Sequence, residues 1–339
     1  MTLSQTAILT KQVITLSTIA IVLGIISFVS YKIWYAYYLA NLPPVEEKPD
    51  TKFGLLPPIN FAESGVSSSN FSYSIDTTTG NLPKVGEEVG FEKLIKVYFV
   101  TKTFATLLSA ERSQNLAEKF AITNPPEILS ETNYRFKDND KTLTVDLDNG
   151  NFVYQKEATI SAGESLDDNN KLVSDFKRTL QFLGVFKDDL NNGRTNVLYL
   201  KNEADAVTAQ VSLWPSKIDD KPIFTSEYNV SDIYAIVSKS ADNLQNYLTL
   251  NFTFYPVDSS TYATYPIKSA EAALDDLKNG KGIVVVEPQK PQVSITSIYL
   301  SYFLPADYNP YLQPIFVFEG PSFAAYVPAI SEEFQTQAN

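Results

Sequence analysis

The sequence predicts an α+β protein in which an N-terminal transmembrane helix precedes repeated modules, each made of one helix and an antiparallel meander. Three observations lead to this prediction. Residues 13–31 contain no charged side chain. Aromatic residues are abundant, with 20 Tyr and 21 Phe, and many alternate with polar residues as in half-buried strands. Three stretches of helical periodicity each come before a run of strand-like segments.

Residues 13–38 are expected to form the membrane anchor. A helix over 13–31 rises about 28 Å, close to the hydrocarbon thickness of a bilayer. Amphipathic rings and a snorkelling lysine are typical of the membrane–water interface, and such a belt follows at Lys32, Trp34, Tyr35, Tyr37 and Tyr38. A cleaved signal peptide is the main alternative. The apolar run is longer than a usual signal-peptide core, and the bulky Tyr38 lies two positions before Ala40, so an uncleaved anchor is favoured.

The segments beside the anchor indicate how the chain is arranged at the cell membrane. Residues 1–12 are expected in the cytoplasm, although Lys11 and Lys32 nearly balance the positive charge on the two sides. The long acidic C-terminal part favours an extracytoplasmic location for the rest of this single-pass protein. Residues 39–60 contain five prolines and predict a semi-rigid spacer.

Charge and composition exclude several classes of function. The chain has 27 Lys and Arg against 39 Asp and Glu. Two of the lysines and no acidic residue lie in residues 1–40, which leaves 25 against 39, or a net charge of −14, for the rest. Such a field repels phosphate, so nucleic acid is not an expected partner. The chain has no His and no Cys, which excludes Ser-His-Asp and Cys-His nucleophiles, the common zinc sites, haem or iron–sulfur ligation and disulfides. We therefore expect no catalytic residue, cofactor or metal, and a disulfide-free extracytoplasmic domain suits a bacterial envelope.

Two α+β modules and a short tail are expected after the spacer. Residues 61–160 form the first module, with a helix over 109–122 that Ser109 is expected to cap. Residues 161–330 form the second, with a helical stripe over 172–183 and a helix that begins at Ser269 and stops at Gly280. Residues 331–339 are the tail. The expected strands lie at 71–75, 93–100, 134–136, 143–147, 152–154, 196–200, 207–214, 223–228, 232–237, 247–255, 282–286, 293–304, 312–319 and 323–330.

The last unit carries a resemblance to a known family. Residues 265–274 read YPIKSAEAAL, 277–280 read LKNG, 298–300 read IYL and 311–318 read YLQPIFVF. These stretches resemble the PepSY-like and YycH/YycI-type extracytoplasmic modules of bacteria, in which a Ser-capped helix, a Gly stop and a three-stranded meander recur. Residues 207–226, with Trp214, are similar to the strand pair that precedes this unit in the YycI type.

The resemblance covers residues 195–330, and residues 90–160 as a pattern only. It implies a single-pass protein that modulates a membrane partner such as a sensor kinase, or that inhibits or chaperones a hydrolase. It brings no catalytic residues to this sequence.

Three groups of residues are weighed against simpler interpretations. Four pairs of adjacent aspartates occur, at 167–168, 188–189, 219–220 and 275–276. Neighbours in sequence do not by themselves supply the separated carboxylates of a glycosidase, so we expect these aspartates on the solvated surface. The Asp-rich stretches 138–140 and 146–150 lack the closing glutamate of a calcium loop, so we expect hairpin turns. An aromatic group is a candidate interaction surface for a glycan or a peptide, and core packing is its simpler interpretation. This group contains Tyr299, Tyr302, Tyr308 and Tyr311, with Phe303 among them.

The sequence therefore predicts a non-catalytic, membrane-anchored, extracytoplasmic interaction or regulatory module of a bacterial envelope, which acts on another membrane or envelope protein. The alternative is a cell-surface binding or assembly component that recognises glycan or neighbouring subunits. An enzyme that uses paired carboxylates ranks last. The first hypothesis predicts an apolar surface patch, the second exposed coplanar aromatic rings, and the third two carboxylates in a deep cleft.

Overall fold

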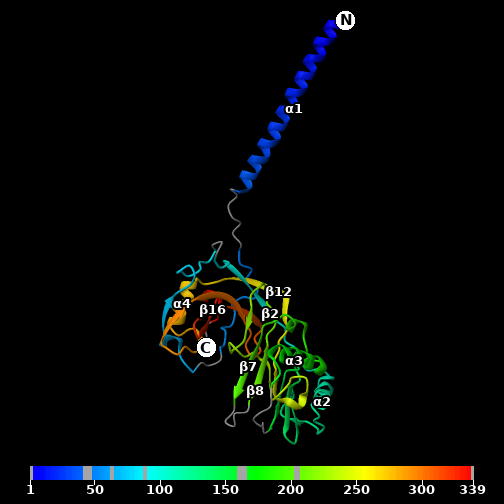
Figure 1. Cartoon of the computed structure of the whole chain (residues 1–339), viewed down its shortest axis with the longest axis vertical. Coiled ribbons are helices and arrows are strands. Elements are labelled where there is room, and N and C mark those ends of the chain that lie inside the picture. Colours follow the sequence, from blue (N-terminus) through cyan, green and yellow to red (C-terminus); the bar gives the residue numbers. More distant parts are fainter. Residues whose placement is uncertain are drawn as a thin grey trace. The chain divides into compact units, whose positions relative to one another are not determined.

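The structure is a computed structural model that describes residues 3–40, 48–61, 65–86, 90–158, 166–201 and 207–336. The chain divides into two units, Met1–Lys48 and Pro49–Asn339. The N-terminal unit is a single long helix, α1 (Leu3–Ala40), drawn in blue in Figure 1. We call the second unit the body.

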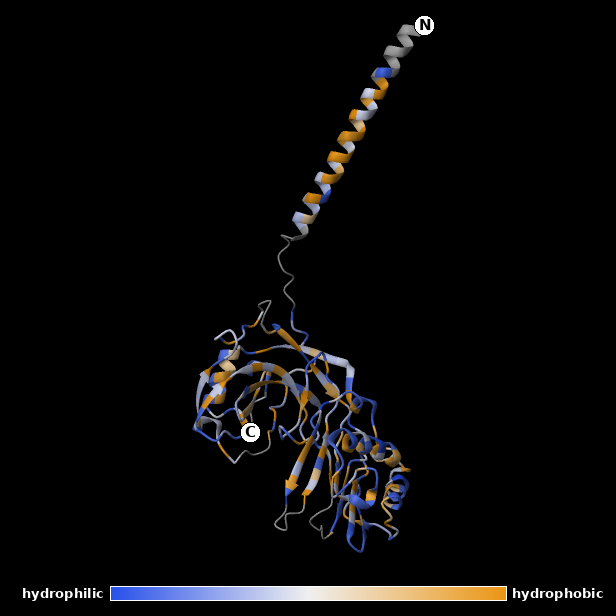
Figure 2. Ribbon diagram, viewed as in Figure 1, coloured by the Kyte–Doolittle hydropathy of each residue, from blue (hydrophilic) through white to orange (hydrophobic). Residues whose placement is uncertain are grey.

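Helix α1 contains the segment that was expected to cross the membrane. Val13–Tyr38 has a mean hydropathy of 2.4, and none of it is buried within the protein. Figure 2 shows hydrophobic residues along much of this helix rather than on one face. A helix that is apolar all round requires an apolar environment, and a lipid bilayer provides one. The structure thus confirms one N-terminal helix that is long and apolar enough to span a bilayer, a property that a signal sequence shares.

One half of the body is an eight-stranded antiparallel sheet. Its order is β3-β4-β5-β6-β11-β10-β8-β7. The strands are β3 (Glu127–Ile128), β4 (Asn133–Asp138), β5 (Lys141–Asp146), β6 (Phe152–Lys156), β7 (Thr195–Lys201), β8 (Val207–Leu213), β10 (Ile233–Val237) and β11 (Tyr247–Phe252).

Helices α2 (Ser109–Lys119) and α3 (Asn169–Leu183) cover one face of this sheet. Each helix buries an apolar stripe, which drives the packing. Leu116 and Phe120 at the end of α2, Phe176 and Leu180 of α3, and the inward side chains of the strands share one hydrophobic core. On the other face of the sheet, Gln155 and the residues two positions before and after it are exposed.

The other half of the body is a seven-stranded sheet around the long strand β16 (Tyr311–Gly320). The order β12-β2-β16-β15-β9 forms its main path, and β17 pairs with both β16 and β13. A second core lies on one face of this sheet, where α4 (Ala270–Lys278) packs against β17. The remaining strands are β2 (Leu94–Val100), β9 (Ile223–Phe224), β12 (Val257–Pro266), β13 (Ile283–Val286), β15 (Ser297–Phe303) and β17 (Phe323–Pro328), with a separate parallel pair β1 (Ser72–Ile75) and β14 (Gln292–Ile295).

A half-buried cation joins the two sheets. The guanidinium carbon of Arg194, just before β7, lies 3.9 Å from the ring centroid of Trp214 and 4.5 Å from that of Phe224 in β9. Its Nη2 donates a hydrogen bond to the carbonyl of Tyr228. Glu319 of β16 accepts hydrogen bonds from two tyrosine hydroxyls beside it, those of Tyr228 and Tyr299.

The α+β class, with one apolar N-terminal helix and largely antiparallel sheets, is confirmed. Two pairings are parallel, β1 with β14 and β9 with β15. The strand expected at 293–304 is divided at Thr296, and β12 was not expected as a strand. Ser269 caps α4 as expected, because its Oγ accepts the amide of Ala272. The cap expected for α2 at Ser109 was wrong, because Leu108 is the N-cap of this helix and no side chain caps it.

Other expectations about the organisation meet the structure only in part. Strands on both sides of residue 160 share the eight-stranded sheet, through the pairing of β6 with β11, and a division into modules 61–160 and 161–330 stays a prediction. Within the expected spacer, residues 41–47 lie outside the described residues, and Leu56 is buried in the body core. The tail contributes a short 3-10 turn, Glu332–Phe334, and residues 337–339 lie outside the described residues.

Candidate functional site

Two cavities lie beside α2, and Lys119 at its C-terminal end lines both. The first has a volume of about 730 Å³ and lies between the end of α2, the middle of α3 and residues 242–245. The second has a volume of about 590 Å³ and lies between the start of α2, the β5–β6 turn and the end of α3. Their chemistry differs, and this difference decides which is the better candidate.

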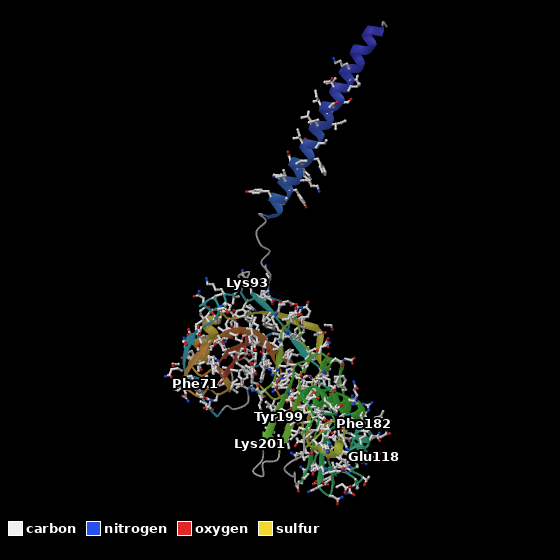
Figure 3. All side chains as sticks on the ribbon, in the orientation of Figure 1. Phe71, Lys93, Glu118, Phe182, Tyr199 and Lys201 are labelled. Atoms are coloured by element: carbon white, nitrogen blue, oxygen red, sulfur yellow. The ribbon has the colours of Figure 1, made fainter. Side chains whose placement is uncertain are left out.

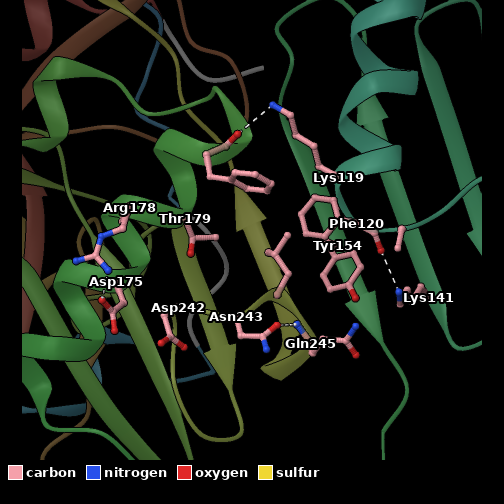
Figure 4. Close-up of a pocket in the computed structure, with 13 residues that line it drawn as sticks. Lys119, Phe120, Lys141, Tyr154, Asp175, Arg178, Thr179, Asp242, Asn243 and Gln245 are labelled. Carbon is pink, nitrogen blue, oxygen red and sulfur yellow. Dashed lines mark hydrogen bonds and ion pairs between the residues drawn. The ribbon is translucent and has the colours of Figure 1, made fainter.

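The two lysines that line the first cavity donate hydrogen bonds to carbonyls at helix ends. Lys119 Nζ donates hydrogen bonds of 3.0 Å to the carbonyls of Phe182 and Leu183, the last residues of α3. Lys141 Nζ donates a hydrogen bond of 3.0 Å to the carbonyl of Phe120, which follows α2. Figure 4 shows one of the hydrogen bonds of Lys119 and that between Lys141 and Phe120. Lysines in these places satisfy carbonyls that have no partner within the helix and interact favourably with the helix dipole.

The acidic and aromatic groups of the first cavity are also engaged within the protein. Asp175 has a side chain that is only 4% exposed, and it accepts from both Lys171 and Arg178. The ring of Tyr154 stacks on that of Phe120 at 4.2 Å, and burial raises the pKa of Tyr154 to about 12. The polar groups of this cavity therefore hold two helices and a loop in place, and it is a structural feature first.

The second cavity has an apolar floor and an exposed apolar lip. Leu116, Leu183 and Phe252 belong to the buried core and line its floor. The lip lies in the loop 101–108 between β2 and α2, where three apolar side chains are largely exposed to solvent. These are Phe104 at 65%, Leu107 at 102% and Leu108 at 53%. We call the second cavity together with this lip the α2 groove.

The lip is fixed by hydrogen bonds of its own backbone. The amide of Ala105 donates to Asp148 Oδ1 at 2.8 Å, and the amide of Thr106 donates to Ser109 Oγ at 3.0 Å. Because Leu108 is the N-cap of α2, the helix start holds the end of the loop as well. Apolar side chains that are exposed on an anchored loop, instead of folding into the core, mark interaction sites.

The acidic side chains that line the α2 groove accept hydrogen bonds, whereas its basic side chains form no ion pair with a described residue. Both carboxylates of the β5–β6 turn accept local hydrogen bonds, Asp146 from the amide of Asp148 and Asp148 from the amide of Ala105. Three cations line the groove as well, and none of them forms an ion pair with a described residue: Arg112, Lys119 and Lys187. In a body that carries excess negative charge, this groove offers basic groups next to apolar surface.

The four tyrosines predicted as an interaction surface are all packed into the body. Tyr302 is fully buried, and its hydroxyl donates to the carbonyl of Lys96. Tyr299, Tyr308 and Tyr311 are half-buried. Tyr308 donates to the carbonyl of Val100 and Tyr311 stacks on Phe53 at 4.9 Å, so the structure does not bring the four rings together as one exposed platform. Their role as an interaction surface stays a prediction.

The acidic pairs and Asp-rich stretches have local structural roles. The stretches 138–140 and 146–150 form the β4–β5 and β5–β6 turns, as expected. Asp168 is the N-cap of α3. The described ranges contain no group of three or more acidic residues that could hold a metal ion. Other members of the pairs form ion pairs: Asp167 with Lys171, Asp219 with Lys96, Asp275 with Lys278, and Asp276 with Lys268 and Lys281.

The predicted membrane-interface residues lie on the C-terminal end of α1. Trp34 stacks on Tyr38 at 5.7 Å, and Tyr35 stacks on Tyr31 at 6.0 Å. Lys32 Nζ lies 5.8 Å from the ring centroid of Phe28. Together with Tyr37 these residues form an exposed aromatic end to the apolar helix, and its position at a membrane interface stays a prediction.

Comparison with known proteins adds no family. No family model matches the chain, and no curated protein matches it. The resemblance of residues 195–330 to PepSY-like and YycI-type modules therefore stays a prediction. Reasoning from sequence missed the α2 groove. The available signal was the stretch TFATLL at 103–108, in which apolar residues precede a helix without helical or strand periodicity.

Proposed function

We propose that this protein is a membrane-anchored, non-catalytic interaction module whose body lies outside the cytoplasm and binds another membrane or envelope protein. The bound part of the partner is an extended apolar segment that carries acidic side chains. It lies in the α2 groove. The observation that carries this proposal is the run of exposed apolar side chains at Phe104, Leu107 and Leu108, of which Phe104 lines the cavity together with its apolar floor.

The chemistry of the groove selects this occupant. Apolar side chains of the partner would replace water over the lip and the floor, which contributes about 25 cal/mol for each Å² of apolar surface removed from water. Acidic side chains of the partner would meet Arg112 and Lys187, which line the groove. The excess acidic charge of the rest of the body would turn such a segment away from other faces, so charge contributes specificity.

Anchoring fits this role. A tether on α1 confines the body to the membrane surface, where a partner in the same membrane is present at high effective concentration. A groove of modest size then suffices for regulation, because affinity does not have to come from contact area alone. The non-catalytic assignment is supported by members of the acidic pairs: Asp168 caps α3, and Asp167 and Asp276 form ion pairs with lysines.

The test is crosslinking of partners in intact membranes with groove variants of the full-length chain. Leu107→Ser and Phe104→Ser are expected to reduce recovery of the partner at least about tenfold, the loss of a central apolar anchor. Arg112→Glu should reduce it as well, because it places an acidic group opposite the acidic segment. Neither serine variant should change stability by more than about 0.5 kcal/mol, because both side chains are exposed.

Val153→Ser is the matched control, since Val153 is also an exposed apolar residue but lies in β6, outside the α2 groove. It should recover the partner as the wild type does. Equal recovery by all four variants would show that the groove is not the docking site.

A further inference from the structure

Among the described residues, the edge of the eight-stranded sheet that lacks the usual protection of an edge strand is β7. Strands at sheet edges expose amide and carbonyl groups that pair with other chains, and proteins protect them by shortness, proline or bulges. The other described strands at sheet edges are short or irregular: β3 and β9 have two residues each, β1 and β14 have four each, and the pairing of β12 and of β13 is interrupted, between Asp258 and Tyr262 and between Val284 and Val286. Strand β7 has seven residues without proline, glycine or bulge.

The hydrogen-bond pattern shows which groups β7 presents. The amide of Trp214 donates to the carbonyl of Arg194, and β7 pairs with β8 in unbroken antiparallel register from there. Hydrogen-bonded pairs alternate along such a ladder, so residues 196, 198 and 200 point their amides and carbonyls toward β8. The amides and carbonyls of residues 195, 197, 199 and 201 therefore point away from the sheet.

The free part of this edge is apolar and uncharged until its last residue. Two side chains of the strand contact the rest of the body, since Asn196 Nδ2 donates to the carbonyl of Asn229 and the hydroxyl of Tyr199 donates to Asn169 Oδ1. Both contacts are made by side chains and leave the outward backbone groups of the strand available. Tyr199 is 52% and Leu200 is 39% exposed. Figure 3 places Tyr199 and Lys201 apart from Phe182 of α3.

The strand is complementary to itself. In an antiparallel pair centred on Leu198, the outward amide and carbonyl of Val197 would pair with those of Tyr199 in a second copy. The outward amide and carbonyl of Tyr199 would likewise pair with those of Val197 in that copy. Aromatic and β-branched residues form favourable cross-strand pairs. The two Leu198 side chains would lie opposite each other, and Lys201 would lie opposite Thr195, so no like charges meet directly across this pair.

We propose that two copies of this chain associate through antiparallel pairing of their β7 strands, centred on Leu198, to form one continuous sheet across a two-fold axis. The interface is isologous, as is usual for homodimers. It uses neither the α2 groove nor its lip, so the dimer and the proposed partner binding stand or fall separately.

A single cysteine tests the two-fold axis directly, because the natural chain has no cysteine. Leu198→Cys would place two thiols across the axis in a non-hydrogen-bonded pair, whose Cα separation of about 4.5 Å suits a disulfide. Oxidation of the full-length protein in nanodiscs or membranes should give at least about tenfold more disulfide dimer than Gln155→Cys. Gln155 is an exposed residue of β6, an interior strand, and provides the control.

Charge variants give a second test that a folding defect cannot imitate. Leu198→Lys and Leu198→Glu would each place like charges opposite each other, and each should be monomeric by native mass spectrometry from detergent. Mixed together, they should form the heterodimer, because opposite charges then meet. Failure of the Leu198→Cys variant to crosslink above the control, or a wild-type chain that is monomeric in both assays, would overturn the proposal.

Discussion

At the scale of single residues, Arg194 is the position on which the body depends most. Its guanidinium stacks between Trp214 and Phe224, and its burial lowers its pKa. Arg194→Leu removes the cation beside Glu319 and the bond to the carbonyl of Tyr228, and should cost on the order of 3 kcal/mol of unfolding free energy. Arg194→Lys should also destabilise, because an ammonium does not stack as a planar guanidinium does. Urea unfolding followed by tryptophan fluorescence measures both losses, and a wild-type midpoint for Arg194→Leu would contradict this account.

A second residue, Asp232, predicts how stability depends on pH. Burial, together with the nearby carboxylates of Glu227 and Asp307, raises its pKa to about 7. Because the folded state holds this proton more tightly than the unfolded state, the contribution of Asp232 to stability is fully present below its ordinary pKa near 4 and is lost as pH rises through 7. Asp232→Asn should therefore be more stable than the wild type at pH 8, and this advantage should shrink toward pH 4. Unfolding midpoints at several pH values check this, and a constant difference would contradict it.

At the scale of elements, the two serines predicted as helix caps differ, and their difference can be measured. Ser269 Oγ accepts the amide of Ala272 at 3.1 Å, whereas α2 has no side-chain cap. Ser269→Ala should cost about 1 kcal/mol of stability, the usual loss of an N-cap. Ser109→Ala is the matched control and should cost less, because the Ser109 hydroxyl bonds with the amide and the hydroxyl of Thr106 in an exposed loop and caps no helix. Equal losses of unfolding free energy for the two variants would show that the Ser269 cap does not stabilise α4.

Periodicity predicted the elements that bury one face, and it missed features that depend on distant parts of the chain. Helix α3 and strands β8, β10 and β16 were expected within a few residues, because each carries a regular apolar pattern. The polar strand β12 was missed, since its order comes from pairing with β2 more than from its own pattern. The sequence SAE occurs at both 109–111 and 269–271, yet only Ser269 caps its helix, because Leu108 in the preceding loop is the N-cap of α2.

The candidate site was the least predictable feature. The lip residues Phe104, Leu107 and Leu108 are recognisable as a candidate site only in the folded protein. Asp148 of the β5–β6 turn fixes their loop, and side chains of the core form the floor of the cavity. The tyrosines near residue 300 were noticed because aromatic residues cluster there in sequence. In the fold each finds a different packing partner.

At the scale of the whole molecule, the chain combines one apolar helix with an acidic body of two sheets. Residues 41–339 carry a net charge of −14, nearly all of it on the body, so the body is expected to remain soluble and to avoid nonspecific contact with anionic surfaces. Its cores hold the two sheets together without disulfides, since the chain contains no cysteine. The exposed apolar surface of the α2 groove is where the proposed partner binds.

The most direct measurement of the central claim is site-specific photocrosslinking at Leu107 in intact membranes. A photoreactive residue at this fully exposed position of the lip, compared with one at Gln155, reports which molecule touches the groove. The account predicts one crosslinked membrane or envelope protein at position 107 and none at 155, with the crosslink mapped by mass spectrometry to an apolar segment that contains acidic residues. Crosslinks of equal yield at both positions, or a crosslinked segment without acidic residues, would contradict it.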